Sequence, residues 1–134
     1  MVMLKRRFRL RWKDVNFLVR RRNYFVNWYF GFFYWEQYPN LKFNQISVNI
    51  PLKYNKRAVK RVELKRWINS YFQRNNVALS PINWKFYKIF LSLNKNNIWE
   101  LKSQLEKFDK KGANDYIIWE LEKTFFKFKN KIWN

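Results

Sequence analysis

The stretch that decides the fold is residues 56–74, KRAVKRVELKRWINSYFQR. Its apolar side chains recur at three- and four-residue steps, the spacing of one helix face: Val59, Val62, Leu64, Trp67, Ile68, Tyr71 and Phe72. Its cations recur at similar steps on another face. The pattern predicts a helix that packs on a core through one side and carries a cationic stripe on the other.

Two segments before this helix have strand patterns. Ile46, Val48 and Ile50 alternate with polar residues, which predicts a short half-buried strand that ends at Pro51. Residues 24–38, YFVNWYFGFFYWEQY, are too short an apolar run for the roughly 20 residues of a membrane helix. We expect a core strand or hairpin with Gly31 at a bulge or bend. The alternative is a set of aromatic platforms on which bases stack.

The first 22 residues contain nine cations and one acid. Phe8, Leu10 and Trp12 alternate with cations, which predicts a basic arm or a strand with one apolar and one charged face. An Arg-rich, acid-poor start is also typical of a mitochondrial presequence. We expect a retained arm or strand.

The segment after Arg74 has helix signals. Ser80-Pro81 predicts the start of a helix that runs to about Leu93. Asn97 and Asn114 are capping candidates for two more helices, with Gly112 as the stop between them. We therefore predict an α+β fold in which a small N-terminal β-rich part precedes three to four helices, including a C-terminal helical hairpin. Residues 1–134 form one domain with a basic arm or strand at 1–22, an aromatic β-rich part at 23–55 and a helical part at 56–134.

Charge gives the first indication of function. The chain has 29 Lys and Arg against 9 Asp and Glu, a formal net charge of +20. Residues 1–75 carry +15 of this charge and all eleven arginines. A guanidinium matches two phosphate oxygens and stacks on bases, whereas Lys is a point charge. We predict one RNA-binding surface formed by Arg6, Arg7, Arg9, Arg11, Lys13, Arg20, Arg21, Arg22, Lys56, Arg57, Lys60, Arg61, Lys65 and Arg66.

Several classes of chemistry are disfavoured by the composition. The chain has no Cys and no His, so it lacks thiolate and imidazole catalysts and the commonest transition-metal ligands. Two glycines cannot build a phosphate-cradling loop. We predict no enzymatic activity, no cofactor, no metal and no small-molecule substrate. No zinc-finger or RRM signature is present, so we expect contacts to phosphates and RNA shape rather than base-specific recognition.

The composition also carries a resemblance. Lys, Asn, Phe, Tyr and Ile, which have AT-rich codons, are abundant, and eight of 134 residues are Trp. In this the chain resembles divergent, mitochondrially encoded proteins of protists such as ciliates. The resemblance implies a structural protein of the mitochondrial ribosome, in the matrix, with ribosomal RNA and neighbouring ribosomal proteins as partners. It would not form an isolated homo-oligomer and would have no transmembrane segment.

Two alternatives to the ribosomal hypothesis remain open. Aromatics beside cations also suit a peripheral accessory subunit of a respiratory-chain membrane complex. A protein-binding module without RNA contact is the second alternative. Trp99, Trp119 and Trp133 are candidate anchors for neighbouring proteins, with a place in the core as the other possibility.

Overall fold

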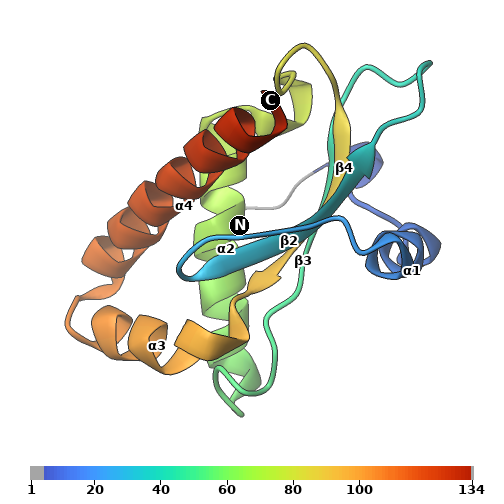
Figure 1. The fold of residues 1–134 in the computed structure, drawn as a ribbon. Coiled ribbons are helices and arrows are strands. Elements are labelled where there is room, and N and C mark those ends of the chain that lie inside the picture. Colours follow the sequence, from blue (N-terminus) through green and yellow to red (C-terminus); the bar gives the residue numbers. More distant parts are fainter. Residues whose placement is uncertain (1–4, 134) are drawn as a thin grey trace.

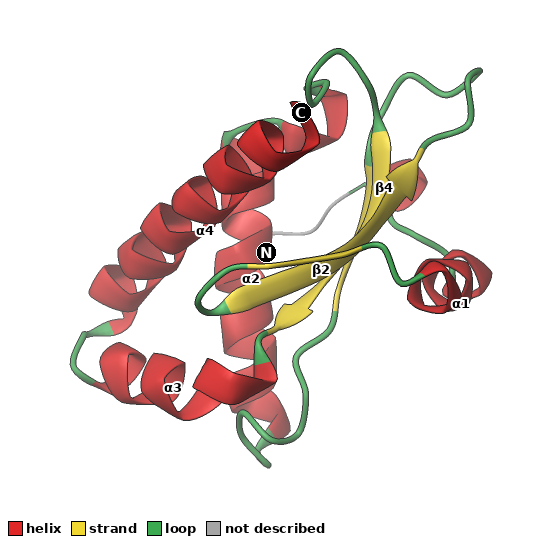
Figure 2. Ribbon diagram, in the orientation of Figure 1, coloured by secondary structure: helices red, strands yellow, loops and turns green. Residues whose placement is uncertain are grey.

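The computed structural model describes residues 5–133, which form a four-stranded sheet with helices on both faces (Figures 1 and 2). In chain order the elements are a 3-10 turn at Arg6–Phe8, α1 (Trp12–Arg21), β1 (Tyr24–Val26), β2 (Phe30–Glu36), β3 (Gln45–Val48), α2 (Ala58–Arg74), a 3-10 turn at Val77–Leu79, β4 (Tyr87–Leu93), a 3-10 turn at Lys95–Asn97, α3 (Ile98–Glu106) and α4 (Lys110–Trp133). The predicted α+β class, with helices at the C-terminal end, is confirmed. Within the described residues, no helix is long and apolar enough to cross a membrane.

The sheet has the strand order β1-β2-β4-β3. β1 and β2 form an antiparallel hairpin, and β2 also pairs antiparallel with β4. β3 runs parallel to β4, and α2 connects the two. Beside β3, Arg9 forms a parallel bridge to Ile46, and the Leu10 N–H donates to the Ile46 carbonyl at 3.2 Å. The N-terminal segment therefore lies along the outer edge of β3.

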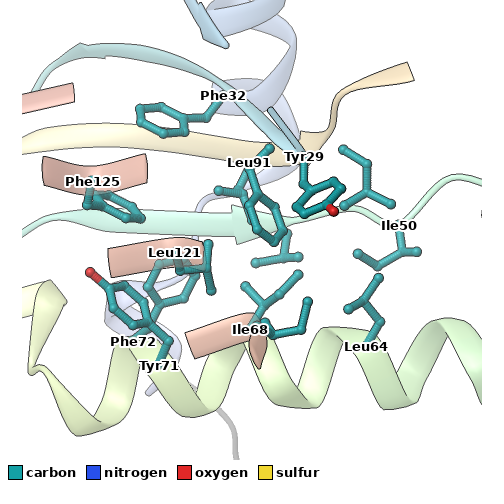
Figure 3. Packing of buried hydrophobic residues seen from close by; sticks show 14 of the residues in the cluster. Tyr29, Phe32, Ile50, Leu64, Ile68, Tyr71, Phe72, Leu91, Leu121 and Phe125 are labelled. Atoms are coloured by element: carbon teal, nitrogen blue, oxygen red, sulfur yellow. The ribbon is translucent and has the colours of Figure 1, made fainter. Parts of the chain in front are cut away.

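The main core lies between the sheet and the α2–α4 layer (Figure 3). Phe32 of β2 stacks on Phe125 of α4 with ring centroids 5.3 Å apart, and Leu64 and Ile68 of α2 are fully buried. The helix predicted at 56–74 is confirmed as α2. Its buried face is narrower than predicted, because Val59 and Val62 are exposed.

The aromatic run at 24–38 forms the β1–β2 hairpin, as predicted. Gly31 is not at a bulge, since it pairs in register with Ser92 in the middle of the sheet. The Tyr24 ring lies against it, and a Cβ at residue 31 would collide with the Tyr24 hydroxyl. Gly31 thus makes room for the Tyr24 ring on the strand and does not serve a bend.

The strand alternative for the first 22 residues is wrong over most of its length. Residues from Trp12 onward form α1, and Trp12 is exposed. Val15 and Leu18 are buried where α1 packs on the sheet, and they are three residues apart, as on one helix face. The alternation of apolar and charged residues just before them favoured a strand and concealed this helical spacing. The arm description holds for residues 5–11, which follow the β3 edge.

The predicted helix from Ser80 to Leu93 is also wrong. Residues 87–93 form β4, with Ile89, Leu91 and Leu93 buried at period two. Ile89 and Leu93 fit both periods, whereas Phe90 fits only the helical one and Leu91 only the strand one, and sheet pairing on both sides of β4 decides the outcome. A strand therefore lies within the predicted helical part at 56–134.

α3 begins directly after Asn97, as predicted, but the boundary between α3 and α4 differs from the prediction. The Asp109 carboxylate accepts from the Gly112 N–H at 2.8 Å, so Asp109 rather than Asn114 caps α4. Gly112 lies in the first turn of α4 and does not end α3. Trp99 and Trp119 are exposed, so they are not core residues. The Trp133 side chain lies outside the described part of the chain.

Candidate nucleic-acid interface

Four arginines gather at the β3 edge. Arg6, Arg7, Arg9 and Arg11 line one open hollow of about 850 Å³, together with Phe43. The Gln45 amide donates to the Arg7 carbonyl at 3.2 Å, and the Arg9–Ile46 bridge fixes the next residues. Backbone pairing to β3 thus places four arginines around the same hollow.

The arginines of the chain lack acidic partners. Among residues 5–133, the five ion pairs all use Lys, at Lys60–Glu63, Lys85–Glu36, Lys88–Asp14, Lys110–Glu63 and Lys123–Glu120. No arginine in that range pairs with a carboxylate. Because a carboxylate partner would offset a guanidinium charge, this distribution leaves the arginine charges without an acidic counterpart within that range.

Most of the predicted cations are accessible. The structure exposes Arg6, Arg7, Arg9, Arg11, Lys13, Arg20, Arg21, Arg22, Lys56, Arg57, Lys65 and Arg66, and leaves Lys60 and Arg61 half-buried. Arg61 holds the turn before α2, since its Nη1 donates to the carbonyls of Asn55 and Lys56 at 2.8 and 2.9 Å. Lys60 lies 3.9 Å from Glu63. The Arg61 and Lys60 side chains therefore already contact polar groups of the chain itself.

The predicted cations lie on three different parts of the fold: the β3 edge, α1 and α2. α1, which carries Arg20 and Arg21, packs on the sheet face opposite to α2 (Figure 1). The Arg6–Arg11 segment lies at the β3 edge. An anionic partner must therefore reach around this edge to touch all three groups.

The sheet face on the α1 side carries aromatic residues that charge alone does not predict. Tyr24, Phe33 and Phe90 form a row of rings, with centroids 4.7 Å apart for Tyr24–Phe33 and 6.4 Å for Phe33–Phe90. They are exposed or half-buried, in contrast to Phe30 and Phe32 on the core side. Burial raises the pKa of the Tyr24 hydroxyl, so this group is a neutral hydrogen-bond donor near pH 7. Phe90 lies on this face because it alternates with the buried Ile89 and Leu91 along β4.

Comparison with known proteins gives a fold but no sequence family. No family model and no curated protein matches the chain. RNase P protein from Thermotoga maritima superposes with a TM-score of 0.63 and 20% identity over 92% of this chain and 96% of its own. The chain has the RNase P protein fold.

Two further solved structures of RNase P proteins also superpose on the chain. Staphylococcus aureus RNase P protein gives a TM-score of 0.59 with 14% identity, over 88% of this chain and 97% of its own. The Thermotoga maritima RNase P protein in complex with 1-(4-fluorophenyl)-2-thiourea gives a TM-score of 0.58 with 22% identity. This superposition covers 80% of this chain and 91% of the Thermotoga maritima protein. The likeness covers nearly the whole of each RNase P protein.

Proposed function

We propose that this protein binds RNA as a structural component of a ribonucleoprotein. The observation that carries the proposal is the hollow at the β3 edge, which four arginines line and where no carboxylate of residues 5–133 pairs with them. Each guanidinium offers two parallel donors to phosphate oxygens. Binding would release condensed counterions from the RNA, which supplies the favourable free energy.

Within this function, the particle that fits best is an RNase P. The fold likeness to RNase P proteins supports this assignment, because it extends over most of both chains. In this proposal the chain contributes binding and positioning, and its own side chains perform no chemistry. The exposed α2 cations and the arginines of α1 would hold parts of the RNA on either side of the sheet.

A mitochondrial ribosomal protein is the second candidate. It is favoured by the AT-rich codon usage that the amino-acid composition implies and by the eight tryptophans. Both candidates use the same arginine surface, and both are compatible with a place in the mitochondrion. They differ in the RNA that is bound and in the proteins that surround it.

The test has two parts. Affinity of the purified protein for folded RNA is measured against salt, and we expect a fall of about 0.7–0.9 log units per log unit of salt for each contacted phosphate. A flat salt response would contradict RNA binding. The RNA that copurifies with the tagged protein from its own cells is then sequenced, and ribosomal RNA in place of an RNase P RNA would favour the second candidate.

A further inference from the structure

The outer side of α4 and its surroundings carries exposed aromatic side chains that the proposed function does not use. They are Trp28 of the β1–β2 turn, Phe108 between α3 and α4, and Trp119 and Phe126 of α4. We call these four residues the α4 aromatic surface. Large apolar side chains that are exposed together mark interaction sites, whereas single ones are an ordinary feature of protein surfaces.

Ring contacts join the members of this surface across three parts of the chain. The Tyr116 ring of α4 packs on Phe108 and Trp119, with ring centroids 5.4 and 6.2 Å apart. The Tyr116 hydroxyl donates to the Tyr29 hydroxyl at 3.1 Å, and the Tyr29 and Trp28 ring centroids are 6.4 Å apart. The turn, the α3–α4 junction and α4 therefore present one continuous set of rings.

An open hollow of about 380 Å³ lies along α4 between two of these rings. Trp119 and Phe126 line it, together with Glu122, Lys123 and Lys127. The two rings are 54% and 66% exposed and are seven residues apart, which is two helical turns. An amphipathic helix presents its anchoring side chains at the same spacing. The hollow therefore matches a helix that lies along α4.

The Trp119 ring is held in position by its own neighbours. Lys123 Nζ lies 3.9 Å from the centroid of this ring and 3.1 Å from a carboxylate oxygen of Glu120. The Tyr116 ring packs on another side of the indole. A side chain that is ordered beforehand loses little conformational entropy on binding, and Trp is among the commonest energetic anchors of protein interfaces. Trp119 thus has the properties of such an anchor.

The charge of this region is unsuitable for RNA. Residues 98–127 contain six lysines, six acids and no arginine, a net charge of zero in a chain of +20. Binding of a polyanion depends on a local surplus of cations. In the hollow itself two lysines face one acid, and Lys127 has no carboxylate partner within residues 5–133. A segment with apolar anchors and a few carboxylates is complementary to this arrangement.

The α4 aromatic surface also lies away from the arginine hollow. β1 and β3 are the two outer strands of the sheet, Trp28 lies in the turn after β1, and the arginine hollow follows β3. Figure 1 shows α3 and α4 on the opposite side of the molecule from α1. A partner at α4 therefore leaves the arginines free. A second copy of the chain is a poor occupant, because two chains of +20 repel each other.

We propose that the α4 aromatic surface docks an amphipathic helix of another protein. Apolar side chains of this helix contact Trp119 and Phe126, and its carboxylates lie near Lys123 and Lys127. This inference goes beyond the proposed function, since it assigns a protein partner to a face that RNA does not need. It does not depend on which RNA the arginines bind.

The test uses a cross-linker at one chosen position, which is possible because the chain contains no cysteine. Glu122→Cys places the cross-linker in the hollow, and Asn40→Cys places it on an exposed residue of the β2–β3 loop as the control. Both variants carry benzophenone maleimide, are added to an extract of the cells that make the protein and are irradiated. Mass spectrometry then identifies the cross-linked segment. We expect Glu122→Cys to label one segment of one other protein, with acids and helically spaced apolar residues, and Asn40→Cys not to label it.

Variants of the two anchors test the contact itself. In the Glu122→Cys background, Trp119→Ala and Phe126→Ala should each lower the yield of this cross-link about 5- to 30-fold at protein concentrations below saturation. The matched control is Trp12→Ala, an exposed tryptophan of α1, which should leave the yield unchanged. All three side chains are exposed, so folding is retained. RNA affinity should change less than twofold in Trp119→Ala and Phe126→Ala.

The outcomes separate this inference from the proposed function. The inference is overturned if Glu122→Cys labels RNA, lipid, a second copy of the chain or nothing, or if the labelled segment has no acidic amphipathic pattern. It is also overturned if Trp119→Ala and Phe126→Ala give the same yield as Trp12→Ala. The salt dependence of RNA affinity is measured without the extract, so a flat response there contradicts the proposed function alone.

Discussion

The ion pair between Asp14 and Lys88 ties α1 to the sheet, and we predict that Asp14→Asn destabilises the protein. Lys88 Nζ lies 3.0 Å from Asp14 Oδ1, and the Lys88 side chain is 4% exposed. Without the carboxylate, Lys88 would remain as a buried charge whose neighbours, the amide oxygen of the new side chain and the Tyr38 ring, carry no net charge. The substitution should therefore lower the free energy of unfolding of the whole domain.

The magnitude follows from burial. Removing one partner of a buried pair costs about 3–5 kcal/mol. Asp14 is 15% exposed, which admits some water, and the cation–π contact persists, so we expect about 2–3 kcal/mol. Replacing both residues with apolar ones, Asp14→Leu with Lys88→Met, should restore the stability to within about 1 kcal/mol of the wild type.

Urea denaturation followed by circular dichroism measures these differences. The control is Asp115→Asn, an exposed carboxylate of α4 that forms no ion pair within residues 5–133, and its effect should stay within about 0.5 kcal/mol. The reasoning is refuted if Asp14→Asn behaves like the control, or if the double variant is no more stable than Asp14→Asn.

Three further predictions concern the core and the buried tyrosines. Phe32→Ala should cost about 3–5 kcal/mol in urea denaturation, because its fully buried ring packs on two α4 rings; a loss below 1 kcal/mol would contradict this packing. Asn44→Ala should cost about 2–4 kcal/mol by the same assay, since its side chain bonds two carbonyls and one N–H between β3 and β4, whereas a neutral result would contradict those bonds. Burial raises the pKa of Tyr54 and Tyr71 to about 12 from 10, so these groups ionise first in the unfolded chain. Stability should therefore be complete below pH 10 and fall between pH 10 and 12, less steeply in Tyr71→Phe; equal slopes would contradict the assignment.

Helices and strands could be predicted from the sequence where the spacing of their apolar residues fits either the helical or the strand repeat, but not both. The segment at 56–74 follows a helical period, and Ile46 and Val48 follow a strand period. β4 could not be predicted, because Ile89 and Leu93 fit both periods, Phe90 favours a helix and Leu91 favours a strand, and the choice depends on pairing with β2 and β3. Long-range partners of this kind leave no local signal.

The candidate site was predicted in its chemistry but not in its arrangement. Arginine placement along the sequence indicates an anion-binding half, and the structure gathers Arg6 to Arg11 in one hollow. The sequence does not show that α1 and α2 lie on opposite sheet faces, since this follows from topology.

The most direct test of RNA binding through the arginine hollow compares two variants of equal charge. One replaces the four arginines of the hollow, Arg6, Arg7, Arg9 and Arg11, with Gln; the other replaces four exposed lysines, Lys95, Lys107, Lys111 and Lys129, with Gln. For each, the slope of log affinity for folded RNA against log salt is measured. The arginine variant should lose about 3 units of slope, the equivalent of four phosphate contacts, and the lysine variant less than about 1. Equal loss of slope in the two variants would show that net charge alone, and not the hollow at the β3 edge, attracts the RNA.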